Sequence, residues 1–143
     1  MRGLSFLVAA VVLAGCPSEP PPTCTTVALD CAPQYVPTFD NVYANTLVAD
    51  CGSTRGGCHA RGGDGEISFA DPATAHAALL AGYVTPGDAA CSEMIVRTHD
   101  VGQAYSMPEG APLAEAERCA LAQWVAAGAP GPGEPLPVTG GTP

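Results

Sequence analysis

Two cysteines and a histidine near the middle of the chain are of types that bind metal ions or haem. Cys51 is followed after six residues by Cys58, and His59 comes next. A Cys-His dipeptide behind a second cysteine is typical of covalent c-type haem attachment, in which the cysteines form thioethers and the imidazole ligates the iron. The usual spacing is two residues. The longer segment from Gly52 to Gly57 must therefore form a loop if both sulfurs are to reach one ring.

The same residues allow two other interpretations. Cys51 and Cys58 could close a small disulfide loop, with His59 on the surface. Alternatively, these three side chains and one further histidine, His76 or His99, would make a Cys₂His₂ zinc set. The spacing matches no standard zinc finger, and an oxidising compartment favours disulfides.

A methionine in a later loop could complete a haem site. Met107-Pro108 lies in the segment 101–112, which lacks helical periodicity. A thioether sulfur and an imidazole are the Met/His axial pair that raises the potential of a haem iron and suits electron transfer. The simpler interpretation of Met107 is a methionine that fills a gap in the core.

Helices must position these residues, because no segment has a convincing strand pattern. Apolar side chains recur at helical spacing after the N-cap Thr38, and Asp71-Pro72 is a typical helix start. Gly128 is suited to end the last helix. We predict an all-α domain with long glycine-rich loops and helices at 39–48, 73–81, 91–98 and 113–127.

The N-terminus has the features of an export signal. A positive residue and an apolar run end in Leu-Ala-Gly-Cys at Cys16, which resembles a bacterial lipobox. We therefore expect residues 1–16 to be a lipoprotein signal peptide, with Cys16 lipidated and the protein anchored to a membrane of the bacterial cell envelope, facing the periplasm or the cell surface. A Pro-rich spacer with a small disulfide loop (17–37), a folded domain (38–129) and a disordered Pro/Gly tail (130–143) would follow.

Six cysteines remain when Cys16 is assigned to the lipid, and their even number leaves two partitions open. In one, Cys51 and Cys58 hold haem while Cys24–Cys31 and Cys91–Cys119 are disulfides. In the other, Cys51–Cys58 is a third disulfide.

Composition limits the classes of function. The formal net charge of −9 argues against binding to nucleic acid or to anionic lipid surfaces. No serine or cysteine nucleophile with an identifiable base, phosphate loop or spaced carboxylate pair is evident. Large apolar residues are few, so a small domain of this kind often needs disulfides, a metal or a large cofactor.

The order of helix, Cys…Cys-His, glycine-rich loop, Met-Pro loop and C-terminal helix resembles the class I c-type cytochrome domain, over roughly residues 38–129. The resemblance implies that Cys51 and Cys58 form thioethers and that His59 and Met107 ligate the iron of a haem c. It also implies packing between the first and last helices, with Phe39 or Tyr43 against Trp124.

This resemblance implies a membrane-anchored carrier of single electrons, serving an unidentified redox partner protein, rather than an enzyme with its own substrate. The alternative is a haem-free, disulfide-stabilised surface lipoprotein that keeps a cytochrome-like scaffold.

Overall fold

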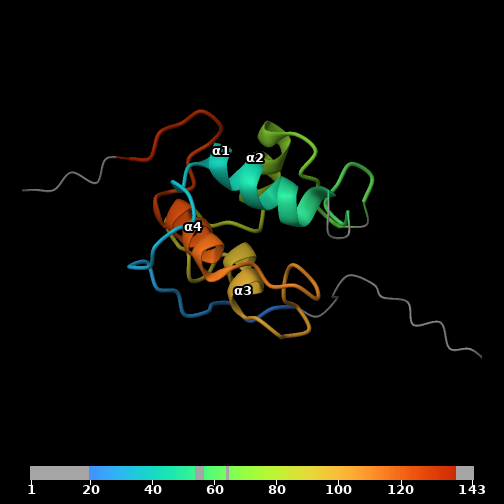
Figure 1. Ribbon diagram of the computed structural model, residues 1–143, viewed down its shortest axis with the longest axis horizontal. Coiled ribbons are helices and arrows are strands. Elements are labelled where there is room, and N and C mark those ends of the chain that lie inside the picture. The colour runs from blue at the N-terminus through green and yellow to red at the C-terminus, as the bar shows by residue number, and fades with distance from the viewer. Residues whose placement is uncertain (1–19, 54–56, 64, 138–143) are drawn as a thin grey trace, which may run out of the picture.

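Helices joined by long loops make up the described part of the chain, residues 20–53, 57–63 and 65–137 of a computed structural model (Figure 1). These residues contain no strand, only an isolated bridge between Thr85 and Asp88. The all-α prediction is confirmed. The helices are α1 (Phe39–Val42), η1 (Tyr43–Ser53), α2 (Pro72–Leu80), α3 (Glu93–His99) and α4 (Glu115–Ala126).

The first predicted helix is present but longer, and most of it has π-helical geometry. Thr38 caps α1 by accepting a hydrogen bond from the Asn41 N–H at 3.4 Å. The chain then continues as the π-helix η1 through Cys51. Hydrogen bonds of the i→i+5 kind widen each turn, so residues five apart, such as Thr46 and Cys51, share one side of η1. The α-helical period of 3.6 residues, on which the sequence prediction depends, does not place Thr46 and Cys51 on the same side.

The other three helices lie within about two residues of their predicted bounds. The Asp71 carboxylate accepts a hydrogen bond from the Thr74 N–H at 2.9 Å, which confirms the predicted start of α2. Gly128 has φ of 97° after α4, a conformation that favours glycine. It therefore ends the last helix as predicted.

The core forms where α1 meets α4. The Phe39 and Trp124 side chains are fully buried, with ring centroids 5.5 Å apart. The His76 ring of α2 contacts Phe39 edge-on at 4.9 Å. The expected contact between the first and last helices is therefore present.

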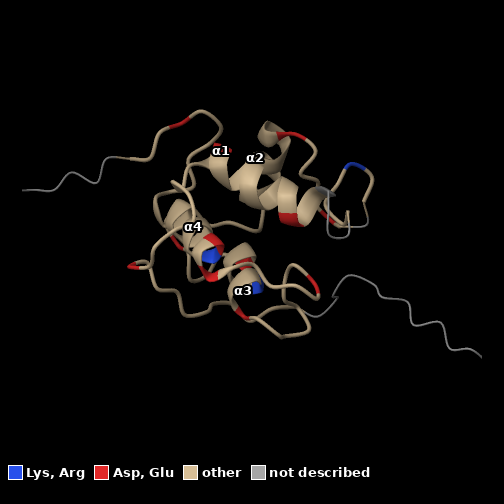
Figure 2. Ribbon diagram, in the orientation of Figure 1, with Lys and Arg blue, Asp and Glu red and all other residues tan. Residues whose placement is uncertain are grey.

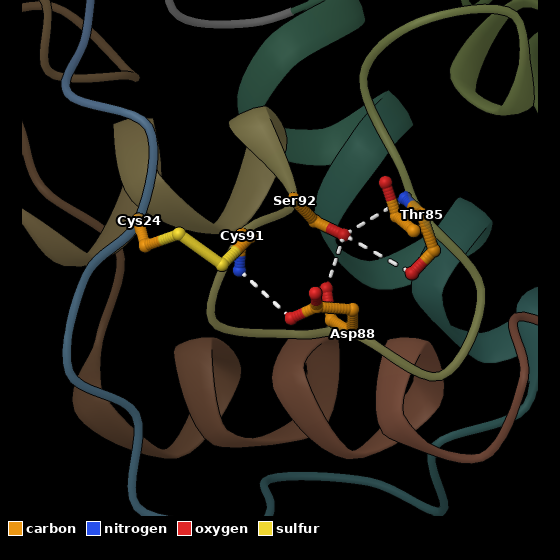
Figure 3. The surroundings of a disulfide bond; sticks show 5 residues. All are labelled: Cys24, Thr85, Asp88, Cys91 and Ser92. Carbon is orange, nitrogen blue, oxygen red and sulfur yellow. Dashed lines mark hydrogen bonds between the residues drawn. A yellow bond between two sulfur atoms is a disulfide. The ribbon is translucent and has the colours of Figure 1, made fainter.

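The disulfides differ from the predicted pairs. Cys24 is bonded to Cys91 (Figure 3) and Cys31 to Cys119, so the predicted Cys24–Cys31 and Cys91–Cys119 pairs are wrong. Cys24 and Cys31 lie on a non-helical segment that runs past α3 and α4 (Figure 1). Cys24 bonds to Cys91, just before α3, and Cys31 bonds to Cys119 in α4. Short spacing along the chain favoured a local loop, but the sulfur partners are set by this long-range packing.

A hydrogen-bonded turn supports the first disulfide (Figure 3). The Asp88 carboxylate accepts from the Cys91 N–H at 3.0 Å. The buried Ser92 hydroxyl donates to the Asp88 carbonyl at 2.7 Å and accepts from the Thr85 N–H at 2.9 Å. These bonds fix the turn that carries Cys91 into α3.

The segments expected to flank the domain also pack against it. Near the N-terminus, the Gln34 N–H donates to the Ala116 carbonyl at 2.9 Å. Residues 130–137, expected to begin a disordered tail, have a buried Gly131, and the Trp124 indole N–H donates to the Pro130 carbonyl at 3.0 Å. A buried indole N–H needs an acceptor, and this segment supplies it.

The signal peptide, the lipidated Cys16 and residues 138–143 lie outside the described residues. None of the helices in the described ranges has the length and apolar composition needed to cross a membrane.

Candidate functional site

A cavity of about 320 Å³ lies between η1, the 57–69 segment, α3 and the loop before α4. Cys51, His59 and Met107, three of the four residues predicted to bind haem, line it. Most of the remaining wall is apolar, with Leu47, Ile67, Phe69, Leu79, Leu113 and Leu121. A mainly apolar cavity with a few convergent polar groups is the usual form of a cofactor site.

His59 is held by a backbone carbonyl and an aromatic ring. Its Nδ1 lies 2.9 Å from the Ile67 carbonyl oxygen, which can only accept, so Nδ1 carries the hydrogen. The imidazole lone pair is then on Nε2. The ring also packs on Phe69, with centroids 4.9 Å apart. Such an orienting hydrogen bond is typical of a histidine that ligates a metal through its other nitrogen.

The described residues on either side of the segment between the cysteines lie close together. The His59 N–H donates to the Cys51 carbonyl at 3.3 Å, and the Gly65 N–H donates to the Cys58 carbonyl at 2.7 Å. A Cβ on Gly65 would lie 2.6 Å from His59 Nδ1. These contacts place the His59 backbone beside Cys51, and glycine is required where the backbone at Gly65 passes the imidazole.

The Cys51 thiol is partly buried against the core. Burial, and then the nearby Asp50 and Glu117 carboxylates, raise its pKa to about 12. In the absence of a metal the sulfur is therefore a neutral thiol at pH 7. The described residues contain no group of three or more His, Cys, Asp or Glu placed to hold a metal ion.

Cys58 is half-buried, and the set of described residues that line the cavity does not include it. Neither Cys51 nor Cys58 is in a disulfide, so the alternative Cys51–Cys58 bridge is not formed. The structure thus brings together Cys51, His59 and Met107 but leaves Cys58 out of the cavity wall.

Met107 reaches the cavity from a loop that is tied to α3. Its N–H donates to the Arg97 carbonyl at 2.8 Å. Met94, a buried residue of α3, also lines the cavity and offers a second thioether sulfur. Sequence reasoning missed Met94, because an apolar position on a short helix is more often part of the core.

A polar network lies behind one wall of the cavity. The Thr46 hydroxyl, which lines the cavity, donates to Glu117 Oε1 at 3.4 Å and is 2.5 Å from the Tyr35 hydroxyl. Glu117 is only 9% exposed, and its other carboxylate oxygen accepts from the Ala114 N–H at 3.2 Å. Burial raises the pKa of Glu117, and the neighbouring Asp50 raises it further. The hydrogen bond from the Ala114 N–H opposes this rise. A glutamate in the first turn of a helix is ordinarily explained by the helix dipole, so its identity alone does not point to this network.

Charged and phenolic groups also line the cavity. Arg97 of α3 (Figure 2) lines it and pairs with Glu93 at 2.7 Å. The Tyr83 hydroxyl donates to Glu66 at 2.7 Å, and this bond, with burial, raises the pKa of Tyr83 to about 12.

The two other histidines, His76 and His99, are not among the described residues that line the cavity. His76 Nε2 is 2.9 Å from the Ala129 carbonyl oxygen. His99 is half-buried near Arg118, and burial, followed by the positive charge of Arg118, lowers its pKa. The structure therefore brings neither of them to Cys51 and His59 to complete the zinc set.

Comparisons of the chain with protein-family models, with curated proteins and with solved structures found no match.

Proposed function

We propose that the protein carries single electrons at a covalently bound c-type haem in this cavity, with His59 and Met107 as the two axial ligands. The observation that carries the proposal is the presence of Cys51, His59 and Met107 in one mainly apolar cavity. They come from η1, the glycine-rich segment and the loop before α4, so the folding of the chain brings three separate segments to one cavity.

The donor set suits a haem. The hydrogen bond from Nδ1 to Ile67 orients the imidazole and directs Nε2 as the ligating atom. The tie between the Met107 N–H and the Arg97 carbonyl limits where the thioether can move. A bound haem would supply an iron that takes up and releases one electron.

Electron transfer would be favoured over catalysis, because an iron held by both His59 and Met107 would have no coordination site left for a substrate or oxygen. The leucines around the cavity would exclude water, which makes the oxidised, more highly charged state less favourable.

The cellular setting is part of the same proposal. A lipid anchor at Cys16 would hold the domain at the surface of a bacterial membrane, where a redox partner protein could reach it. Proline-rich residues 17–23 would separate the domain from that surface.

A haem stain of the denatured protein tests the proposal. The unlipidated Cys16→Ser chain should be expressed in a host that matures c-type cytochromes and separated on a denaturing gel. We expect a haem-positive band and a reduced visible spectrum of the c type. Since His59 is the proposed proximal ligand, His59→Ala should lose most of the signal while His99→Ala keeps it. A folded, colourless protein would support the haem-free surface lipoprotein instead.

A further inference from the structure

We propose that the haem is attached through a single thioether, to Cys51, and that the Cys58 sulfur takes no part in the linkage. This inference rests on the proposed function and assigns different chemistry to the two cysteines of the motif. The spacing alone treats them as equivalent.

Cys51 is the cysteine that faces the cavity. It lies five residues after Thr46 on the π-helix η1, and both residues line the same wall. In an α-helix residues five apart point in clearly different directions, whereas the wider π turn brings them onto one side. The unusual helix therefore places the Cys51 sulfur beside the space that a ring would fill.

His59, and not Cys58, lines the cavity together with Cys51. The hydrogen bond from the His59 N–H to the Cys51 carbonyl brings the two backbones together. Both His59 and Cys51 then line the cavity, but Cys58 does not. In this arrangement an imidazole and one thiol converge on the same space.

The backbone of Cys58 is held where it is. Its carbonyl accepts the Gly65 N–H at 2.7 Å, and a Cβ at Gly63 would lie 2.4 Å from the same oxygen. Moving the Cys58 backbone toward the cavity would require a shift of this closely packed segment. That shift would also disturb His59, whose ring lies next to Gly65.

The linkage is an addition with no net oxidation. The Cys51 S–H bond breaks, a bond forms between sulfur and the vinyl carbon next to the porphyrin ring, and the hydrogen is added to the terminal vinyl carbon. The second vinyl group stays intact. The co-reactant is haem itself.

Two measurements on the matured, unlipidated full chain test the inference without a variant. Denatured protein is treated with iodoacetamide without reduction and digested, and we expect a carbamidomethyl group on Cys58 and haem on the peptide that carries Cys51. The reduced spectrum in alkaline pyridine should show the absorption band of a haem with one vinyl group remaining. Haem bonded to both cysteines would overturn the single linkage and leave electron transfer in place.

Matched variants give a second readout. Cys58→Ala should keep at least 80% of the covalent haem of the wild type, whereas Cys51→Ala should lose at least 90% of it. Circular dichroism checks that both variants fold. Loss of covalent haem in Cys58→Ala, with retention in Cys51→Ala, would overturn the assignment. A wild-type chain that folds without haem would overturn the proposed function as well.

Discussion

The N–H of His59 donates to the carbonyl oxygen of Cys51 at 3.3 Å, although six residues separate Cys51 from Cys58. The insertion therefore does not move the histidine away from the first cysteine. Both residues line one cavity despite their separation in sequence.

Gly65→Ala should disturb the orientation of His59. The new Cβ would meet His59 Nδ1 at 2.6 Å and the Cys58 carbonyl oxygen at 2.7 Å, so the hydrogen bond to Ile67 must lengthen or break. We expect a loss of about 1–3 kcal/mol of unfolding free energy, as for other substitutions that crowd a packed site. Urea unfolding and haem content measure the effect.

Gly82→Ala is the matched control. A Cβ at position 82 meets nothing within 4 Å, so the unfolding free energy of this variant should differ from that of the wild type by no more than about 0.5 kcal/mol. Equal effects of the two substitutions would contradict the proposed contact between Gly65 and the imidazole.

Met107→Leu should lower the reduction potential of the haem-loaded protein. Leucine nearly keeps the volume of methionine but cannot ligate iron, so the fold should be retained while the axial pair is lost. Axial ligands set haem potentials over a range of roughly 0.8 V, and we expect a shift on the order of 0.1 V. Spectroelectrochemical titration measures it.

Met94→Leu separates ligation from packing. Met94 lines the same cavity, but it is a buried residue of α3 and is not assigned to the iron. The reduction potential of the haem-loaded Met94→Leu variant should therefore stay near that of the wild type. If Met94→Leu shifts the potential and Met107→Leu does not, the axial ligand is Met94.

The disulfide pairing can be read from one tryptic digest. Cleavage after arginine places Cys24 and Cys31 on the peptide 3–55, Cys91 on 62–97 and Cys119 on 119–143. The structure predicts that all three peptides stay linked until reduction. A linked pair of 62–97 and 119–143, with 3–55 alone, would instead match the pairing expected from spacing.

Removing either disulfide should also destabilise the fold. The sequence separations are 67 and 88 residues, and loops of this length correspond to about 4 kcal/mol in the chain-entropy account. We therefore expect Cys24→Ser/Cys91→Ser and Cys31→Ser/Cys119→Ser to lose similar amounts of unfolding free energy. Urea denaturation measures both, and a negligible loss in either would show that its bond does not constrain the unfolded chain.

Local signals predicted the helices well, because caps and apolar spacing act within a few residues. Thr38, Asp71 and Gly128 mark helix ends as expected. The π geometry of η1 and the disulfide partners depend on contacts between distant segments, which one sequence does not reveal. Of the four residues that the sequence predicts at the site, Cys51, His59 and Met107 line the cavity and Cys58 does not.

The residues missed at the site, Met94 and Glu117, have identities that are ordinary on a helix. A methionine on α3 is consistent with any core, and a glutamate in the first turn of α4 is consistent with the helix dipole. Only the packing of η1 against α4 shows that the Glu117 carboxylate is buried behind Thr46.

Glu117→Gln should make the protein relatively more stable as the pH rises. Burial raises the pKa of Glu117 in the folded state, so the native protein holds this proton more tightly than the unfolded chain does. The stabilising contribution of the protonated group is therefore fully present below the unfolded pKa, near 4.5, and is lost as the pH rises through the folded pKa. Glutamine has no such loss and can still accept from the Ala114 N–H and donate to Thr46.

The unfolding free energies of wild type and Glu117→Gln should therefore be similar at pH 4 and diverge above it, in favour of the variant. Urea unfolding at a series of pH values measures the difference. Glu115→Gln, an exposed position on the same helix, should show a much smaller divergence. A difference between wild type and Glu117→Gln that does not change with pH would mean that the Glu117 carboxyl is as well solvated in the folded protein as in the unfolded chain. The network behind Thr46 would then not retain the proton.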